Sequence, residues 1–349
     1  METPLIAEHR AAHAQLAEYH GCLLPEKFSD LQTEYRAAKE TVAIFDTNWH
    51  AIFSLSGPDR VRYLNAIVSN DIKSVGEAYG TRALLLNPQG HILADLEVYA
   101  LAEKLLVRTH ASVRERTFAT LDKFIIMDDV TLEDLTDQFG SFAVEGPQAG
   151  TVVAQACGLA LEGFSEFANA ELPIDGVPCH LIRRSHFGGM GAEIIAPREH
   201  LGLLWQSMHA RVHAAHGASI GMATLNALRL EAGVPWFPDD FNDTVIPHEA
   251  SLEATHVSFT KGCYTGQEIV ERVRSRGHVN RRRVLLTFSG EAAPAPGTKL
   301  RAAGAEVGYV TSAAFSPAAG KAIGMGYVRR EHNAAGTILE FDGGTAIVA

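Results

Sequence analysis

The sequence predicts an α+β fold in which two related α+β units precede a small antiparallel β barrel or sandwich. First, a β-strand pattern that ends in a Gly-Pro corner and continues as a helical pattern occurs twice, around Gly57-Pro58 and Gly146-Pro147. Second, each copy continues into a hairpin and a second helix. Third, helical patterns stop near residue 281, and short β-like runs between Gly/Pro/Ala-rich turns follow.

The first copy starts as a strand at residues 51–55 and turns at Ser56-Gly-Pro-Asp59 into a helix. Pro58 suits the first turn of a helix because its missing N–H needs no partner there. Residues 82–86 and 91–99 then predict a hairpin around the turn Asn87-Pro-Gln-Gly90, and residues 111–124 predict a helix.

The second copy repeats this order, with a strand at 141–145, a hairpin around Gly188–Gly191 and a helix at 198–215. In this alignment Asp95 and Glu193 occupy matching strand positions. We therefore expect two α+β units that pack around a shared cleft, with one carboxylate from each.

These patterns predict a division of the chain into four parts. Residues 1–50 together with 140–245 form the first α+β domain, and residues 51–139 form the second. Residues 246–280 form a linker that contains a helix, and residues 281–349 form the C-terminal β-barrel domain.

Composition excludes several classes of protein. The chain has 349 residues, of which 46% are hydrophobic and 20% charged, so disorder, collagen and small disulfide scaffolds are excluded. The four cysteines are far apart, so neither a disulfide framework nor a metal site is expected. With no apolar signal segment and no run approaching 18 apolar residues, the simplest expectation is a cytoplasmic protein that does not enter a membrane.

The segment Lys261-Gly-Cys-Tyr-Thr-Gly-Gln-Glu268 carries the most information. Thr265 and Glu268 have the spacing of a capping box, which places a helix start at Thr265. Cys263 would then lie just outside the positive end of that helix, where Lys261 also favours a thiolate. The alternative is a small buried cysteine in a tight turn.

A basic run follows this segment, although the net charge of the whole chain is −11. Residues 261–283 contain Lys261 and six arginines against two glutamates, a net charge of +5. The arginines are Arg272, Arg274, Arg276, Arg281, Arg282 and Arg283. An anionic partner such as a polycarboxylate tail, a phosphate or RNA would explain this charge, and the alternative is a solvated linker that pairs with the acidic body.

Two further features stand next to each other in the sequence. Arg229 lies near the end of a helix, where it contacts either an anionic ligand or a carboxylate of the chain such as Glu231. The segment Pro238–Asp243 lacks the glycine and the final glutamate of a calcium loop, so we expect a solvated acidic loop. Neither a phosphate-binding loop nor a G-x-S-x-G elbow is present.

The segment 261–268 resembles the K-G-C-[FY]-x-G-Q-E signature of the YgfZ family of folate-binding proteins. These proteins are paralogues of the glycine-cleavage T-protein, a tetrahydrofolate-dependent aminomethyltransferase. Supporting segments span most of the chain: Ser56–Asp59, Ser69–Asp71, Leu86-Asn87, Asp95–Tyr99, Leu228–Gly233, Val310–Ser312 and Ser316-Pro317.

The resemblance implies a three-domain cloverleaf that binds tetrahydrofolate, or a one-carbon-substituted folate, in a central cavity. It also implies that Asp95, Tyr99, Glu193 and Arg229 line the pterin end. A carboxylate suits that place because the aminopterin ring presents adjacent N–H donors. The sequence departs from the T-protein pattern at Ala94, where a second aspartate is usual, and at Arg82, where a tyrosine is usual.

Within the YgfZ family the implied role is accessory: tetrahydrofolate-linked assembly or repair of iron–sulfur clusters in other enzymes, under oxidative stress. Cys263, Lys261 and Asp95 would be the reacting residues, and contact with client enzymes or assembly factors would be transient, since one cysteine supplies one ligand where a cluster takes four. The alternative is an aminomethyltransferase or demethylase of the T-protein type, with Asp95 as the acid/base residue. A third hypothesis is an RNA-associated factor linked to tRNA modification.

Overall fold

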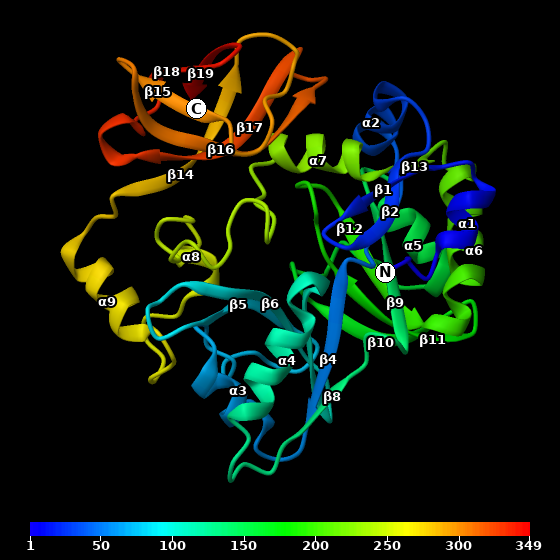
Figure 1. The fold of residues 1–349 in the computed structure, drawn as a ribbon. Coiled ribbons are helices and arrows are strands. Elements are labelled where there is room, and N and C mark those ends of the chain that lie inside the picture. Colours follow the sequence, from blue (N-terminus) through cyan, green and yellow to red (C-terminus); the bar gives the residue numbers. More distant parts are fainter. The chain divides into compact units, whose positions relative to one another are not determined.

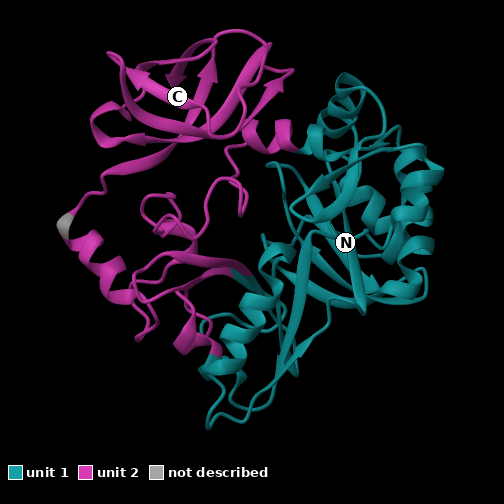
Figure 2. Cartoon of the chain, in the orientation of Figure 1, with its two compact units in different colours: residues 1–63, 73–81, 97–225 teal, residues 64–72, 82–96, 226–349 magenta. Residues whose placement is uncertain are grey.

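The computed structural model describes residues 1–349 except for the side chain of Arg276. The chain forms two compact units (Figure 2). The first consists of residues 1–63, 73–81 and 97–225, and the second of residues 64–72, 82–96 and 226–349. The boundaries of the predicted four-part division stay a prediction.

A six-stranded sheet forms the larger core of the first unit, with strand order β10-β11-β12-β9-β3-β13 (Figure 1). Its strands are β3 (Ala43–Asp46), β9 (Phe139–Glu145), β10 (Asn169–Ile174), β11 (Val177–Arg183), β12 (Gly191–Pro197) and β13 (Ala218–Ser219). Helices α5 (Ala149–Cys157) and α6 (Arg198–Ala214) pack on it through buried side chains that include Val152, Val153, Leu204 and Trp205. Gly158 ends α5 in the left-handed conformation that glycine adopts without strain.

The chain enters this unit through short elements. These are α1 (Ile6–Ala11), the hairpin of β1 (Gln15–Tyr19) and β2 (Cys22–Lys27), and α2 (Leu31–Glu40). Asp30 sets the start of α2 because its side chain accepts a hydrogen bond of 2.9 Å from the backbone N–H of Thr33.

A second sheet has the strand order β5-β6-β7-β4-β8. Its strands are β4 (His50–Ser56), β5 (Gly80–Leu86), β6 (Ile92–Ala100), β7 (Lys104–His110) and β8 (Thr131–Asp134). The accompanying helices are α3 (Arg60–Ile67), the 3-10 turn η1 (Ala111–Val113) and α4 (Arg114–Lys123). Strands β5 and β6 each run from one unit into the other.

The internal repeat is confirmed, since the strand order β5-β6-β7-β4 recurs as β10-β11-β12-β9. The predicted match of Asp95 with Glu193 is wrong by one strand. Ser56 pairs with Lys104 on β7, and Glu145 pairs with Gly191 on β12, so Glu193 corresponds to a residue on β7 rather than on β6. The sequence pattern does not reveal strand β10, because Pro173 interrupts it.

The second unit ends in the predicted barrel, which is closed and antiparallel in the order β14-β17-β16-β15-β18-β19. Its strands are β14 (Arg281–Phe288), β15 (Lys299–Ala302), β16 (Ala305–Ser316), β17 (Lys321–Arg329), β18 (Ile338–Phe341) and β19 (Gly344–Val348), and the 3-10 turn η2 (Arg330–His332) follows β17. Before the barrel lie α7 (Met222–Glu231), which begins in the first unit, α8 (Glu253–His256) and α9 (Gln267–Arg276). The predicted α+β fold class is confirmed.

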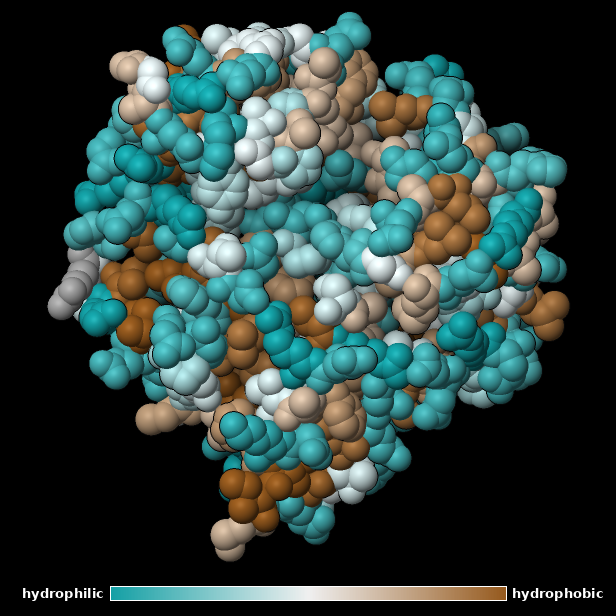
Figure 3. All heavy atoms as spheres, in the orientation of Figure 1, coloured by the Kyte–Doolittle hydropathy of each residue, from teal (hydrophilic) through white to brown (hydrophobic). Residues whose placement is uncertain are grey.

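Hydrophilic side chains dominate the face drawn in Figure 3, and hydrophobic ones form small separate groups. Ile126 and Met127, which follow α4, are 81% and 92% exposed. Among the described helices, none is both long enough and apolar enough to cross a bilayer.

Candidate functional site

The cysteine segment lies in the second unit, where Lys261 anchors it. The Lys261 ammonium donates to the backbone carbonyl oxygens of Asn65, of Val68 at 2.5 Å and of Asn70 at 3.0 Å. Asn65 lies in the last turn of α3, and Val68 and Asn70 follow its end, where a helix leaves backbone acceptors without partners of its own. Lys261 thus fastens the segment to residues 65–70.

Cys263 is exposed, so the alternative of a buried cysteine in a tight turn is wrong. Gly266 has a φ of +83°, and a Cβ atom there would lie 2.7 Å from the carbonyl oxygen of Asn87. The segment therefore runs close against the turn between β5 and β6 while the thiol faces solvent.

The predicted capping box at Thr265 and Glu268 is also wrong. Helix α9 begins at Gln267 with Gly266 as its N-cap, and no side chain caps it. The physical reason is the close passage over Asn87, which requires the left-handed Gly266 and delays the start of the helix.

Asp95 lies on β6 in the second unit, next to a buried histidine. Its Oδ1 atom is 3.2 Å from Nε2 of His256, and the Asp95 side chain is 23% exposed while that of His256 is 2% exposed. Thr255 Oγ1 lies 2.7 Å from Nδ1 of the same imidazole, and Ser69 donates to the backbone carbonyl of His256 at 2.6 Å. The result is a partly accessible carboxylate within ion-pair distance of an oriented imidazole, with no hydrogen bond between Oδ1 and Nε2.

Tyr99 and Glu193 lie in the first unit, within a buried network of charges. Arg108 forms ion pairs with Glu193 and with Glu97, the latter at 3.5 Å, and the Tyr99 hydroxyl donates to Glu97 at 2.9 Å. Arg184 adds a second cation 2.8 Å from Glu97. Tyr99, Arg108 and Glu193 have no measurable exposure.

This network fixes the charge states of its members. Burial alone would raise the pKa of the Glu193 carboxyl, but Arg108 and His186 outweigh it and hold that pKa well below its usual range. Burial and the Glu97 charge raise the pKa of Tyr99 well above its usual value. Both residues therefore have protein partners, and their contact with folate stays a prediction.

Sequence reasoning missed Arg108, although a signal is present. It directly follows the apolar run Leu105–Val107 in β7, which is buried from Leu105 to His110. An arginine in the buried part of a strand needs a carboxylate partner, which predicts a site of this kind.

Arg229 is buried and pairs with Asp240 rather than with Glu231. Its guanidinium also lies 4.6 Å from the ring centroid of Trp236. Asp240 further accepts hydrogen bonds from the hydroxyls of Thr311 at 2.6 Å and Ser312 at 2.5 Å. The expectation of a solvated acidic loop is wrong at Asp240, because four donors from the loop, α7 and the barrel surround it.

The basic run is largely paired within the second unit. Arg281 lies 3.1 Å from Glu249, Arg282 lies 2.6 Å from Glu253, and Arg274 stacks over the ring of Phe259. These contacts fit the solvated linker better than an anionic partner. The side chain of Arg276 lies outside the described residues, and the described ones contain no cluster of three or more residues suited to a metal ion.

Two family models match this chain. The model of the GCVT N-terminal domain matches residues 5–261, and that of the glycine cleavage T-protein C-terminal barrel domain matches residues 281–346. The chain belongs to the glycine cleavage T-protein family. An aminomethyltransferase of Streptomyces coelicolor is 29% identical over 96% of this chain and 91% of its own length. An aminomethyltransferase of Rippkaea orientalis is also 29% identical, over 98% of this chain and 93% of its own length.

A solved structure has the same fold. The glycine cleavage system aminomethyltransferase T of Bartonella henselae superposes with a TM-score of 0.91 over 100% of this chain and 96% of its own, at 24% identity. These T-protein family comparisons do not distinguish the YgfZ branch from the T-protein branch.

Proposed function

We propose that this chain binds a reduced folate and transfers a one-carbon group to it, as an aminomethyltransferase or demethylase of the T-protein type. Relatives along nearly the whole chain are named aminomethyltransferases, which favours this alternative over the accessory role in iron–sulfur maintenance. The observation that carries the proposal is Asp95, a partly exposed carboxylate held against the buried imidazole of His256.

Asp95 fits the chemistry of tetrahydrofolate. A partly accessible carboxylate can accept a hydrogen bond from the folate amine that receives the one-carbon unit. Tyr99, Glu193 and Arg229 are buried, whereas the side chain of Asp95 is partly exposed, so we assign the first folate contact to Asp95. Those three residues stay candidates for further contacts with the folate.

When bound, tetrahydrofolate supplies the amine that receives the one-carbon unit. The carboxylate of Asp95 can hold or take a proton beside that amine, a role that contributes about 10²- to 10⁴-fold to a rate. His256 acts as a positioning residue, because Thr255 orients its ring and Ser69 holds its backbone. Lys261 fixes residues 65–70, and Ser69 belongs to that stretch.

The experiment follows an isotopically labelled one-carbon group from an aminomethyl or N-methyl donor to tetrahydrofolate by mass spectrometry. Asp95→Asn keeps the shape of the side chain and removes its proton affinity, so we expect a rate at least about 100-fold lower. Asp122→Asn, at an exposed carboxylate, serves as the matched control and should leave the rate unchanged. Equal rates for Asp95→Asn and the wild type would contradict the proposal.

The exposed Cys263 favours a second candidate, the accessory role in assembly or repair of iron–sulfur clusters. A thiol on a segment anchored by Lys261 can meet a partner protein without rearrangement of the fold. In cells that lack the endogenous homologue, a [4Fe–4S] enzyme under oxidative stress should regain activity with the wild type and not with Cys263→Ala. Equal rescue by both forms, or by neither, would exclude this role for the Cys263 thiol. One-carbon transfer does not need Cys263, so that result would leave the first proposal unaffected.

A further inference from the structure

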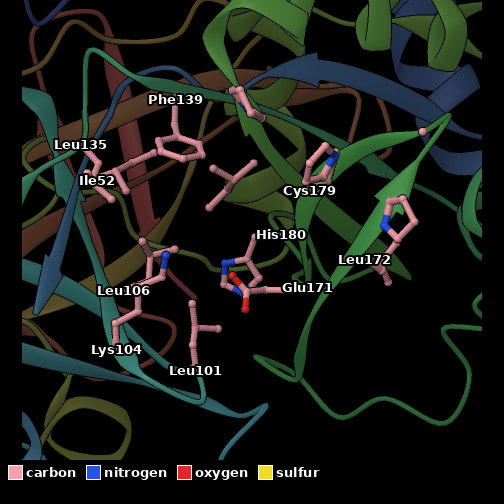
Figure 4. Close-up of a pocket in the computed structure, with 15 residues that line it drawn as sticks. Ile52, Leu101, Lys104, Leu106, Leu135, Phe139, Glu171, Leu172, Cys179 and His180 are labelled. Atoms are coloured by element: carbon pink, nitrogen blue, oxygen red, sulfur yellow. The ribbon is translucent and has the colours of Figure 1, made fainter. Parts of the chain in front are cut away.

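A cavity of about 480 Å³ lies inside the first unit (Figure 4), and the ring of Tyr99 packs edge-on against His180 in its wall, with the ring centroids 6.0 Å apart. Strands β4 and β7 of one sheet and β9, β10, β11 and β12 of the other line it. Its walls are apolar side chains, among them Ile52, Leu106, Phe139 and Ile195. The volume falls in the range of about 300–1,000 Å³ that is typical of small-molecule sites.

Three polar residues line this cavity: His180 and Glu171 lie next to each other, and Lys104 comes from β7 of the other sheet (Figure 4). Glu171 on β10 lies directly opposite His180 on β11, so the two side chains share one face of the sheet. Neither Lys104 nor Glu171 has an ion-pair partner in the described part of the chain. The cavity therefore combines one cation at the half-buried Lys104, one anion at the exposed Glu171 and the buried imidazole of His180 with apolar walls.

The hydrogen bonds of His180 define which of its atoms is available. Asn169 Nδ2 donates to the carbonyl of Phe167 at 3.4 Å, so its Oδ1 atom accepts from Nε2–H of His180 at 3.0 Å. Nδ1 then carries a lone pair, and this atom has no hydrogen-bond partner among the described residues. Because His180 is only 7% exposed, this acceptor has lost most of its hydration without gaining a donor from the chain.

Electrostatics keep this imidazole neutral. Burial, together with the charges of Arg108 and Lys104, lowers the pKa of His180 to about 3. A neutral acceptor beside Glu171 suits an N–H donor that carries positive charge, and Lys104 suits a carboxylate.

We propose that this cavity binds an apolar α-amino acid. The side chain of the ligand fills the apolar space, its carboxylate pairs with Lys104, and its ammonium donates to Nδ1 of His180 and pairs with Glu171. An acid without the ammonium would bring a second carboxylate to Glu171, and an amine without the carboxylate would bring a second cation to Lys104. The zwitterion is the head group that complements both charges.

Calorimetric titration tests this site with L-phenylalanine and L-leucine as probes. Their analogues 3-phenylpropionate and 2-phenylethylamine each lack one charge, and glycine lacks the apolar side chain. We expect both apolar amino acids to bind, and all three comparison compounds to bind at least about 10-fold more weakly. The ¹⁵N resonance of His180 Nδ1 should move on addition of L-phenylalanine, because the lone pair gains a donor.

Two variants separate the charges. Lys104→Met and Glu171→Gln should each lower the affinity for L-phenylalanine about 10-fold or more. Lys123→Met, at an exposed lysine on α4, is the matched control and should bind as the wild type does. An absence of binding at about 10 mM, equal affinity for 3-phenylpropionate, or unchanged affinity in both charge variants would overturn the proposal.

Discussion

Replacing Asp240 by asparagine should destabilise the second unit strongly. The amide would keep the shape of the side chain but remove the charge that neutralises Arg229, which is 1% exposed. The hydroxyls of Thr311 and Ser312, which donate to the carboxylate, would have to turn and accept from the new NH₂ group. Removal of one partner from a buried ion pair costs about 3–5 kcal/mol, because the remaining charge stays buried and unpaired. We therefore expect Asp240→Asn to lower the free energy of unfolding by that amount.

Equilibrium unfolding in urea, followed by circular dichroism, measures this loss. Asp243→Asn, at an exposed carboxylate of the same loop, is the control and should change the free energy of unfolding by no more than about 0.5 kcal/mol. The double variant Arg229→Met/Asp240→Asn removes both charges, so it should be less destabilised than the sum of the two single variants. A loss below about 1 kcal/mol for Asp240→Asn, or strict additivity in the double variant, would refute the reasoning.

Three further predictions concern other parts of the chain. Lys261→Met should lower the free energy of unfolding by about 2–4 kcal/mol and speed hydrogen exchange in residues 64–72, since three backbone carbonyls lose a charged donor. His50 and His180 each have a pKa of about 3 in the folded protein and about 6.5 in the unfolded chain. Between about pH 3 and 6.5 the unfolded chain therefore binds more protons than the folded protein does. Stability should therefore fall as the pH is lowered from about 6.5 towards 3, by up to about 1.4 kcal/mol per pH unit for each histidine, as urea unfolding at several pH values would measure. With a thiol-reactive chromogenic disulfide, Cys263 should react rapidly in the native protein, whereas burial shields Cys179 and raises its pKa to about 11.

Each of these measurements has a matched control. Lys73→Met changes an exposed lysine directly after residues 64–72, and faster exchange in that stretch for both variants alike would argue against a specific anchor at Lys261. His213→Gln, at an exposed position, should leave the pH dependence of stability intact, whereas His50→Gln should reduce it. If one thiol still reacts rapidly with the disulfide in Cys263→Ala, another cysteine is the reactive one.

Local patterns predicted much of this fold because they report on local physics. The Gly-Pro corners, the helix at 198–214 and the barrel strands each follow from residues adjacent in sequence. Strand β10 was not predicted, because Pro173 interrupts its β pattern. Without β10, the sequence alignment of the two copies matched Asp95 with Glu193, which is wrong by one strand.

The candidate site was less predictable because its partners are distant in sequence. The local sequence predicts that Asp240 belongs to an acidic loop. The hydroxyls that donate to it, on Thr311 and Ser312, lie 71 and 72 positions further along the chain. Lys261 stands out in the sequence for its proximity to Cys263, whereas its three acceptors lie more than 190 positions earlier. No spacing rule connects such residues, so only the three-dimensional structure could assign these roles.

The anchoring of Lys261 has a consequence for how descendants of this chain can diverge. Its ammonium holds residues 65–70, Ser69 within that stretch holds the backbone of His256, and His256 faces Asp95. A lineage that no longer needs the thiol could replace Cys263 at little cost to folding, because that side chain faces solvent. Loss of Lys261 would instead disturb the surroundings of Asp95, so we expect the lysine of this signature to outlast its cysteine when selection on the cysteine is relaxed.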